Sequence, residues 1–130
     1  MMRARSDQTD SRGLIVTAAL CGALAIVLGA FAAHGAEPDA RALLTTAGHY
    51  LLVHAVLAVA CGFWGGRPAI RAGALALGGA LVFCLALSAI ALLGLRWMGA
   101  VAPIGGVLMI LGWLLLGHAA WRQKRSQDPS

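Results

Sequence analysis

Histidines supply most of the side chains that could carry chemistry in this 130-residue chain. His49 and His54 lie in one apolar stretch without formal charge, and His118 lies in another. Apolar stretches of this length are candidates for membrane spans. Ionisable groups inside a membrane are costly, so each is a functional hypothesis by default. His54 would lie near mid-membrane, where it needs an acceptor such as Ser88 or a backbone carbonyl. We favour a hydrogen bond between helices as its role; a proton relay or a substrate contact is the alternative.

A metal site needs at least three well-placed ligands, and the spacing of the histidines does not favour one. His49 and His54 are five residues apart, about 140° around a helix, so their side chains point away from each other. His34, Glu37 and Asp39 gather at the end of the first apolar stretch, where His49 could approach them. We therefore expect no metal or other cofactor, with His34 and His49 as the candidates for an outer-face metal or redox site.

The signatures of common enzymes are missing from the sequence. It contains no Gly-x-Ser-x-Gly elbow, no phosphate-binding glycine loop before a lysine and no Cys-x-x-Cys pair. Cys21, Cys61 and Cys84 all fall within apolar stretches, where we expect them to serve as small packing residues. We predict that the chain is not an enzyme.

Composition indicates that membrane helices hold these residues. Apolar residues make up 60% of the chain and charged residues 12%, with a mean hydropathy of +0.82, whereas soluble domains are about 45–50% apolar and about 25% charged. Because about 20 apolar residues cross the hydrocarbon core, we predict an all-α, integral membrane four-helix transmembrane bundle. Its spans are 13–33, 43–64, 73–95 and 103–121. The connections are an outer loop with the start of the second helix (34–42), a cytoplasmic loop (65–72) and an outer turn (96–102), between tails at 1–12 and 122–130.

The basic residues predict the orientation of these spans. Eight of the ten lie in the two tails and the 65–72 loop, and only Arg41 and Arg96 lie on the opposite side. This bias places both termini in the cytoplasm, in a bacterial-type inner membrane. The same topology accounts for the pI near 10.1, so nucleic-acid binding is not expected. Residues 1–33 also resemble a cleaved secretory signal, but the apolar run is longer than usual and favours a retained span.

Small residues recur at helical spacing in every span and predict close helix packing. Association in lipid depends on close contact, which small side chains allow. The first and third spans have four-residue spacing, and the second and fourth have seven-residue spacing. We call each such run of small residues a seam. The predicted seams are, in the first span, Thr17, Cys21, Ala25, Gly29 and Ala33; in the third, Ala72, Ala76, Ala80, Cys84 and Ser88; in the second, Gly48, Ala55 and Gly62; and in the fourth, Gly105, Gly112 and Ala119. We expect all four to face inward; the alternative is that spans rich in Ala and Gly produce such spacing by chance.

Two segments resemble a known family. The first contains GAFAAHG and, further on, YLLVHAVLAVA; the second contains VAPIGG leading into an apolar helix with LGW. Together they resemble the small membrane proteins of the YgdD/YwdK type, the transmembrane protein 256-like family or domain of unknown function 423. The resemblance implies a four-helix membrane protein without an established activity, and its motif-matching positions are His34, Gly35, His54, Pro103, Gly105 and Gly106. The chain departs from the family at 83–86, where Phe-Cys-Leu-Ala replaces a Phe-Ser-Gly-Ser type of segment.

Three functional hypotheses follow. The first is an accessory or scaffolding protein that associates within the lipid bilayer, either as a homo-oligomer or with another membrane protein. The second is a transporter or channel for a small or weakly polar solute that uses His54. The third is the metal or redox site at His34.

Overall fold

Four long helices form the protein in the computed structural model, which describes the backbone of residues 2–127 and the side chains of residues 8–123. The helices are α1 (Met2–His34), α2 (Pro38–Trp64), α3 (Arg67–Leu93) and α4 (Ala102–Gln127), and a short 3-10 helix, η1 (Arg96–Ala100), precedes α4. Each long helix supplies most or all of a segment long and apolar enough to cross a membrane. The prediction of an all-α fold with four helices long and apolar enough to cross a membrane is therefore confirmed.

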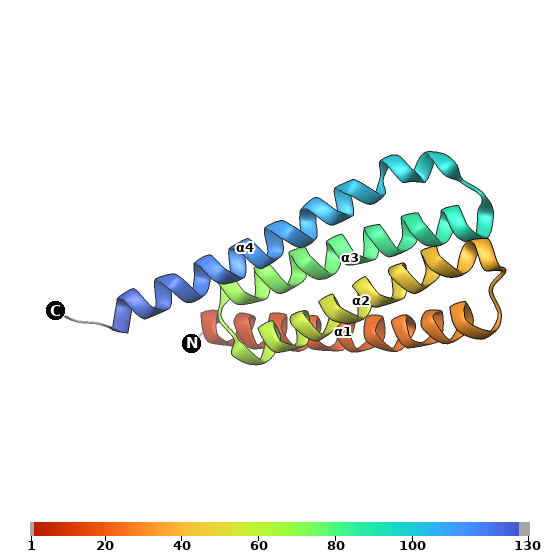
Figure 1. Ribbon diagram of the computed structural model, residues 1–130. Coiled ribbons are helices and arrows are strands. Elements are labelled where there is room, and N and C mark those ends of the chain that lie inside the picture. Colours follow the sequence, from red (N-terminus) through yellow and green to blue (C-terminus); the bar gives the residue numbers. More distant parts are fainter. Residues whose placement is uncertain (1, 128–130) are drawn as a thin grey trace.

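The helices run antiparallel, and each packs mainly on its neighbour in the chain (Figure 1). The extensive contacts are those of α1 with α2, α2 with α3, and α3 with α4; α1 touches α3 less. The start of α1 and the end of α4 consequently lie at the same end of the molecule (Figure 1). Within the described residues, α1 and α4 occupy the two edges of the arrangement.

Glycines make the tight reversals that this topology requires. Gly65 and Gly66 connect α2 to α3 with φ angles of +76° and +80°, a region that residues with a Cβ atom rarely enter. Gly94 ends α3 in the left-handed conformation with φ of +67°, and its amide donates to the Ile90 carbonyl, as in common helix C-caps. Pro38 begins α2, where its missing N–H leaves no intrahelical bond unmade.

The α3–α4 interface brings backbone against backbone. A methyl group added to Gly105 would lie 2.6 Å from the Gly79 carbonyl oxygen and 2.6 Å from the Phe83 nitrogen. One added to Gly112 would lie 2.6 Å from the Ala76 Cβ. Gly105 and Gly112 of the fourth span's predicted seam thus lie against the third span, where Ala72, Ala76, Ala80 and Cys84 are all buried.

The α1–α2 interface is also close. A methyl group on Gly48 would lie 3.1 Å from the Ala25 carbonyl oxygen, and one on Gly62 would lie 2.5 Å from Ile15 Cγ1. In α1, Cys21 and Ala25 are buried and Gly29 is half-buried.

The ends of the seam predicted for α1 do not follow the interface. Thr17 and Ala33 are exposed, whereas Ala18 and Ala32 are fully buried. Four-residue spacing exceeds the 3.6-residue turn of a helix, so a four-residue stripe winds away from a fixed neighbour. The buried positions combine spacings of three and four residues and so keep to one face.

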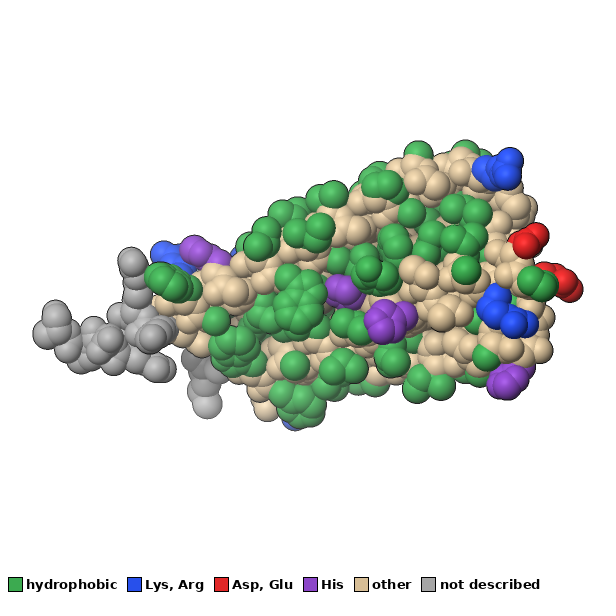
Figure 2. Space-filling view, in the orientation of Figure 1, with side chains coloured by type: hydrophobic (Ala, Val, Ile, Leu, Met, Phe, Trp, Pro, Cys, Tyr) green, Lys and Arg blue, Asp and Glu red, His purple; other side chains and the backbone are tan. Residues whose placement is uncertain are grey.

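Large apolar side chains cover the outside of the helices. Leu20 is 68% exposed, Val27 65% and Leu114 64%. Figure 2 shows hydrophobic side chains along the middle of one face, with charged side chains at the ends. An apolar surface of this extent, which water-soluble monomers rarely expose, suits a lipid environment.

Candidate functional site

His54 is the one buried polar or charged side chain in the described part of the chain, with 4% of its surface exposed. It lies on α2, and both of its ring nitrogens have partners. The Nδ1 atom lies 2.7 Å from the Tyr50 carbonyl oxygen, one turn earlier in the same helix. The Nε2 atom lies 3.3 Å from Nε1 of Trp113 on α4. His54 therefore connects two helices that are not neighbours in the chain.

The two partners determine the tautomer of His54. A carbonyl oxygen only accepts hydrogen bonds, so the imidazole proton must lie on Nδ1 and donate to Tyr50. The indole N–H only donates, so Trp113 donates to the unprotonated Nε2 atom. The ring is thus a neutral imidazole with its single donor and single acceptor both used. A second proton, on Nε2, would set two donors against each other and break the link to α4.

Aromatic rings from three helices surround this link. Tyr50 on α2 lies edge-on to Phe83 on α3, with ring centroids 5.1 Å apart. The His54 and Trp113 rings are also edge-on, with centroids 6.4 Å apart. Edge-to-face packing of this kind adds about 0.5–1.5 kcal/mol per aromatic pair. The cluster therefore ties α2, α3 and α4 together.

Ser88 is engaged elsewhere. Its hydroxyl forms a hydrogen bond with the thiol of Cys84, one turn earlier on α3. Of the two acceptors considered for His54, the backbone carbonyl is the one used, and it belongs to Tyr50.

The candidate ligands His34, Glu37 and Asp39 lie where α1 ends and α2 begins, whereas His49 lies eleven residues after the start of α2; His34 and His49 are both exposed. Among residues 8–123, no three His, Cys, Asp or Glu side chains form a group that could hold a metal ion. His49 instead packs edge-on to Tyr50, with ring centroids 6.1 Å apart. The described side chains thus do not assemble the outer-face metal site considered from the sequence.

The motif glycines have different surroundings. The Gly35 amide donates to the Phe31 carbonyl at 2.7 Å where α1 ends, and a methyl group there would lie 2.8 Å from the Phe31 ring. Pro103 is exposed in the first turn of α4. Gly105 is buried against α3, but a methyl group on the adjacent Gly106 would meet nothing within 4 Å.

A groove between α1 and α3 was not predicted from the sequence. It has a volume of about 430 Å³, and the buried side chains that line it are Leu14, Ile70 and Leu77. Its other lining residues include two small-residue pairs at four-residue spacing: Gly13 and Thr17 on α1, and Ala74 and Gly78 on α3. We refer to this feature as the α1–α3 groove. The available signal lay in these pairs: Thr17 belongs to the seam predicted for the first span and Gly13 lies four residues before it, whereas Ala74 and Gly78 are out of phase with the seam predicted for the third span.

The fold and the apolar surface together define a small integral membrane protein built from four helices. Residues 28–106 match the family model described as protein of unknown function (DUF423). The chain is 35% identical over 109 residues to a UPF0382 membrane protein of Staphylococcus haemolyticus, covering 78% of this chain and 89% of the relative. It is 37% identical over the same length to one from Staphylococcus saprophyticus, covering 78% of this chain and 91% of the relative.

A Staphylococcus aureus relative with the same description is 32% identical over 115 residues, covering 83% of this chain and 94% of the relative. The chain belongs to the DUF423 family, which confirms the resemblance noted in the sequence. No solved structure matches it significantly.

Proposed function

We propose that this protein is an accessory, non-enzymatic membrane protein that works by lateral association with a second copy of itself. The observation that carries this proposal is the α1–α3 groove and its small-residue walls. Helices associate closely in lipid where small residues let their backbones approach. The groove offers such positions on two adjacent helices, on a surface that the chain leaves uncovered.

The two glycines of the groove make no close contact within the chain. Methyl groups on Gly13 and Gly78 would meet nothing within 4 Å, whereas one on Gly79 would lie 2.7 Å from the Gly105 carbonyl oxygen. A helical glycine costs about 1 kcal/mol relative to alanine. Contacts within the fold explain that cost at Gly79, and a helix of a second copy would explain it at Gly13 and Gly78.

Symmetry favours a second copy as the occupant. The α1 helix forms one wall of the groove and also carries two of its small residues, Gly13 and Thr17. Around a two-fold axis, each α1 would lie in the groove of the other subunit, so that one patch serves both partners. Two-fold dimers with such self-complementary patches are the commonest oligomers.

The hydrogen bonding of His54 supports an accessory role over the transport alternative. Both ring nitrogens are bonded within the chain, so a relay or solute contact at His54 would first have to break the bond to Trp113. The observed arrangement is that of a structural link between α2 and α4.

Filling the groove should weaken dimerisation without disturbing the fold. We expect Gly78→Leu to raise the dimer dissociation constant about tenfold, a loss of about 1.4 kcal/mol, because the leucine side chain would hold the two helices apart where small residues let them approach. Energy transfer between labelled copies in vesicles measures this constant. Gly117→Leu is the matched control, since Gly117 is exposed on α4 and a methyl group there meets nothing within 4 Å. Equal dissociation constants for the two variants would contradict the proposal.

We also propose that both termini face the cytoplasm of a bacterial cell. Arg12 lies toward the start of α1, Arg67 and Arg71 lie at the start of α3, and Arg122 lies toward the end of α4, and these helix ends share one end of the molecule (Figure 1). Arg41 lies at the start of α2, at the other end. This asymmetry supports the positive-inside orientation. A carboxyl-terminal fluorescent-protein fusion should be bright and a carboxyl-terminal alkaline phosphatase fusion inactive. The reverse pattern would overturn the orientation.

A further inference from the structure

A basic cleft opens where α2 ends, α3 begins and α4 ends. It has a volume of about 930 Å³, and its lining includes Trp64, Arg67, Arg71, Leu115, His118 and Arg122. Three arginines and a histidine line it and no acidic side chain does, while Arg67 and Arg71 also border a smaller pocket of about 300 Å³ together with Asp10. A cleft of this charge is suited to an anion. Guanidinium groups bind phosphate particularly well because their fixed fork of donors matches the phosphate oxygens.

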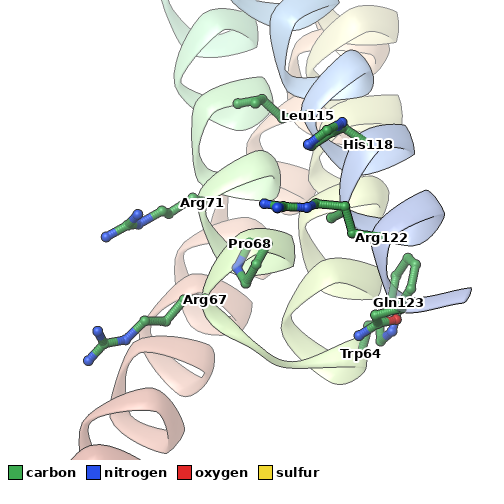
Figure 3. A pocket seen from close by; sticks show the side chains of 9 residues that line it. Trp64, Arg67, Pro68, Arg71, Leu115, His118, Arg122 and Gln123 are labelled. Atoms are coloured by element: carbon green, nitrogen blue, oxygen red, sulfur yellow. The ribbon is translucent and has the colours of Figure 1, made fainter. Parts of the chain in front are cut away.

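The cleft is also polar at one end and apolar toward the middle of the molecule. Along α4, Leu115 lies seven residues before Arg122, about 10 Å deeper along the helix. Trp64, half-exposed at the end of α2, marks the level at which tryptophans occupy the membrane interface. Figure 3 shows Arg122 reaching from α4 toward α3 with His118 nearby, while Arg67 and Arg71 extend outward from α3. The lining thus changes in the same order as a phospholipid, from phosphate to acyl chain.

We propose that this cleft binds the headgroup of an anionic phospholipid, with Arg122 on its phosphate, the Arg71 side chain turning in from the rim to join it, and the start of an acyl chain against Leu115. Basic clefts between membrane helices bind anionic headgroups because each arginine near the surface adds attraction for them. The net negative charge of the lipid is essential to the proposal, since zwitterionic headgroups carry their own cation. The site does not depend on the α1–α3 groove, which lies between other helices.

Native mass spectrometry of the purified full chain tests this site, with phosphatidylglycerol and phosphatidylcholine as probes. We expect one phosphatidylglycerol to bind with about tenfold preference over phosphatidylcholine. Arg71→Gln and Arg122→Gln, each alone and combined, should reduce this preference, and the combined variant should bring it within about twofold. Arg12→Gln is the matched control, because Arg12 is exposed on α1 at the same end but outside the lining of the cleft. It should keep the full preference.

Three results would overturn the proposal. Equal binding of the two lipids would remove the charge selectivity. An equal loss in Arg12→Gln would show general attraction to a basic membrane end rather than a site. Displacement of phosphatidylglycerol by millimolar inorganic phosphate would identify a site for a free anion. The melting temperature of each variant is measured in parallel, and the single variants decide the outcome if the combined one unfolds.

Discussion

Replacing Gly105 with alanine is expected to lower the free energy of unfolding by about 3 kcal/mol, because overpacking a close interface usually costs about 1–3 kcal/mol. The added methyl group would lie 2.6 Å from both the Gly79 carbonyl oxygen and the Phe83 nitrogen. Both atoms belong to backbone, so no side chain can turn aside. The helices α3 and α4 would have to separate along their contact. Reversible unfolding in bicelles, monitored by steric trapping, measures this decrease in the free energy of unfolding.

Gly106→Ala is the control for this prediction. The two glycines are adjacent in the first turns of α4, but a methyl group on Gly106 meets nothing within 4 Å. Alanine is favoured over glycine in a helix by about 0.5–1 kcal/mol, so this variant should be as stable as the parent or slightly more stable. If Gly105→Ala were equally well tolerated, α3 and α4 would not be in backbone contact.

Replacing His54 with leucine should lower the free energy of unfolding by about 1–2 kcal/mol, because a hydrogen bond between membrane helices has about this worth. The substitution leaves the Trp113 N–H without its acceptor and removes the side chain that links α2 to α4. A double-mutant cycle with Trp113→Phe, measured by the same unfolding assay, isolates the pair. We expect a coupling energy of about 1 kcal/mol.

His54→Gln should recover part of this loss, since an amide oxygen can accept the indole N–H. A coupling energy near zero would show that His54 and Trp113 do not interact. Solute flux that is lost in His54→Gln, although the protein stays folded, would instead favour the transport hypothesis.

The helices could be predicted because their signals are local. Long apolar runs identify the spans, and the prolines and glycines near their ends explain where α2 and α3 begin and end. The seams of α3 and α4 could also be predicted, since Ala76 and Gly112 lie on short repeating patterns. In α1, only the centre of the predicted stripe follows the interface, because a straight four-residue repeat takes no account of helical twist.

The partner of His54 could not be predicted from the sequence. Trp113 lies 59 residues from His54, and its position beside the ring depends on how α4 packs across α3. The α1–α3 groove could not be predicted for the same reason: it depends on how the helices pack. Its walls come from two helices that are not consecutive, α1 and α3. Residues such as Thr17 and Gly78 come to line it because the rest of the fold leaves them uncovered, and the sequence around them does not show this.

Disulfide cross-linking in native membranes tests the association proposal most directly, in a background in which Cys21, Cys61 and Cys84 are replaced by alanine. Thr17→Cys places a thiol of similar size in the α1–α3 groove without filling it, and Val16→Cys places one on α1 outside the lining of the groove, where the side chain is 60% exposed. We predict a covalent dimer, at twice the chain mass, from position 17 and little or none from position 16. No dimer from position 17, or equal yields from the two positions, would contradict association through this groove.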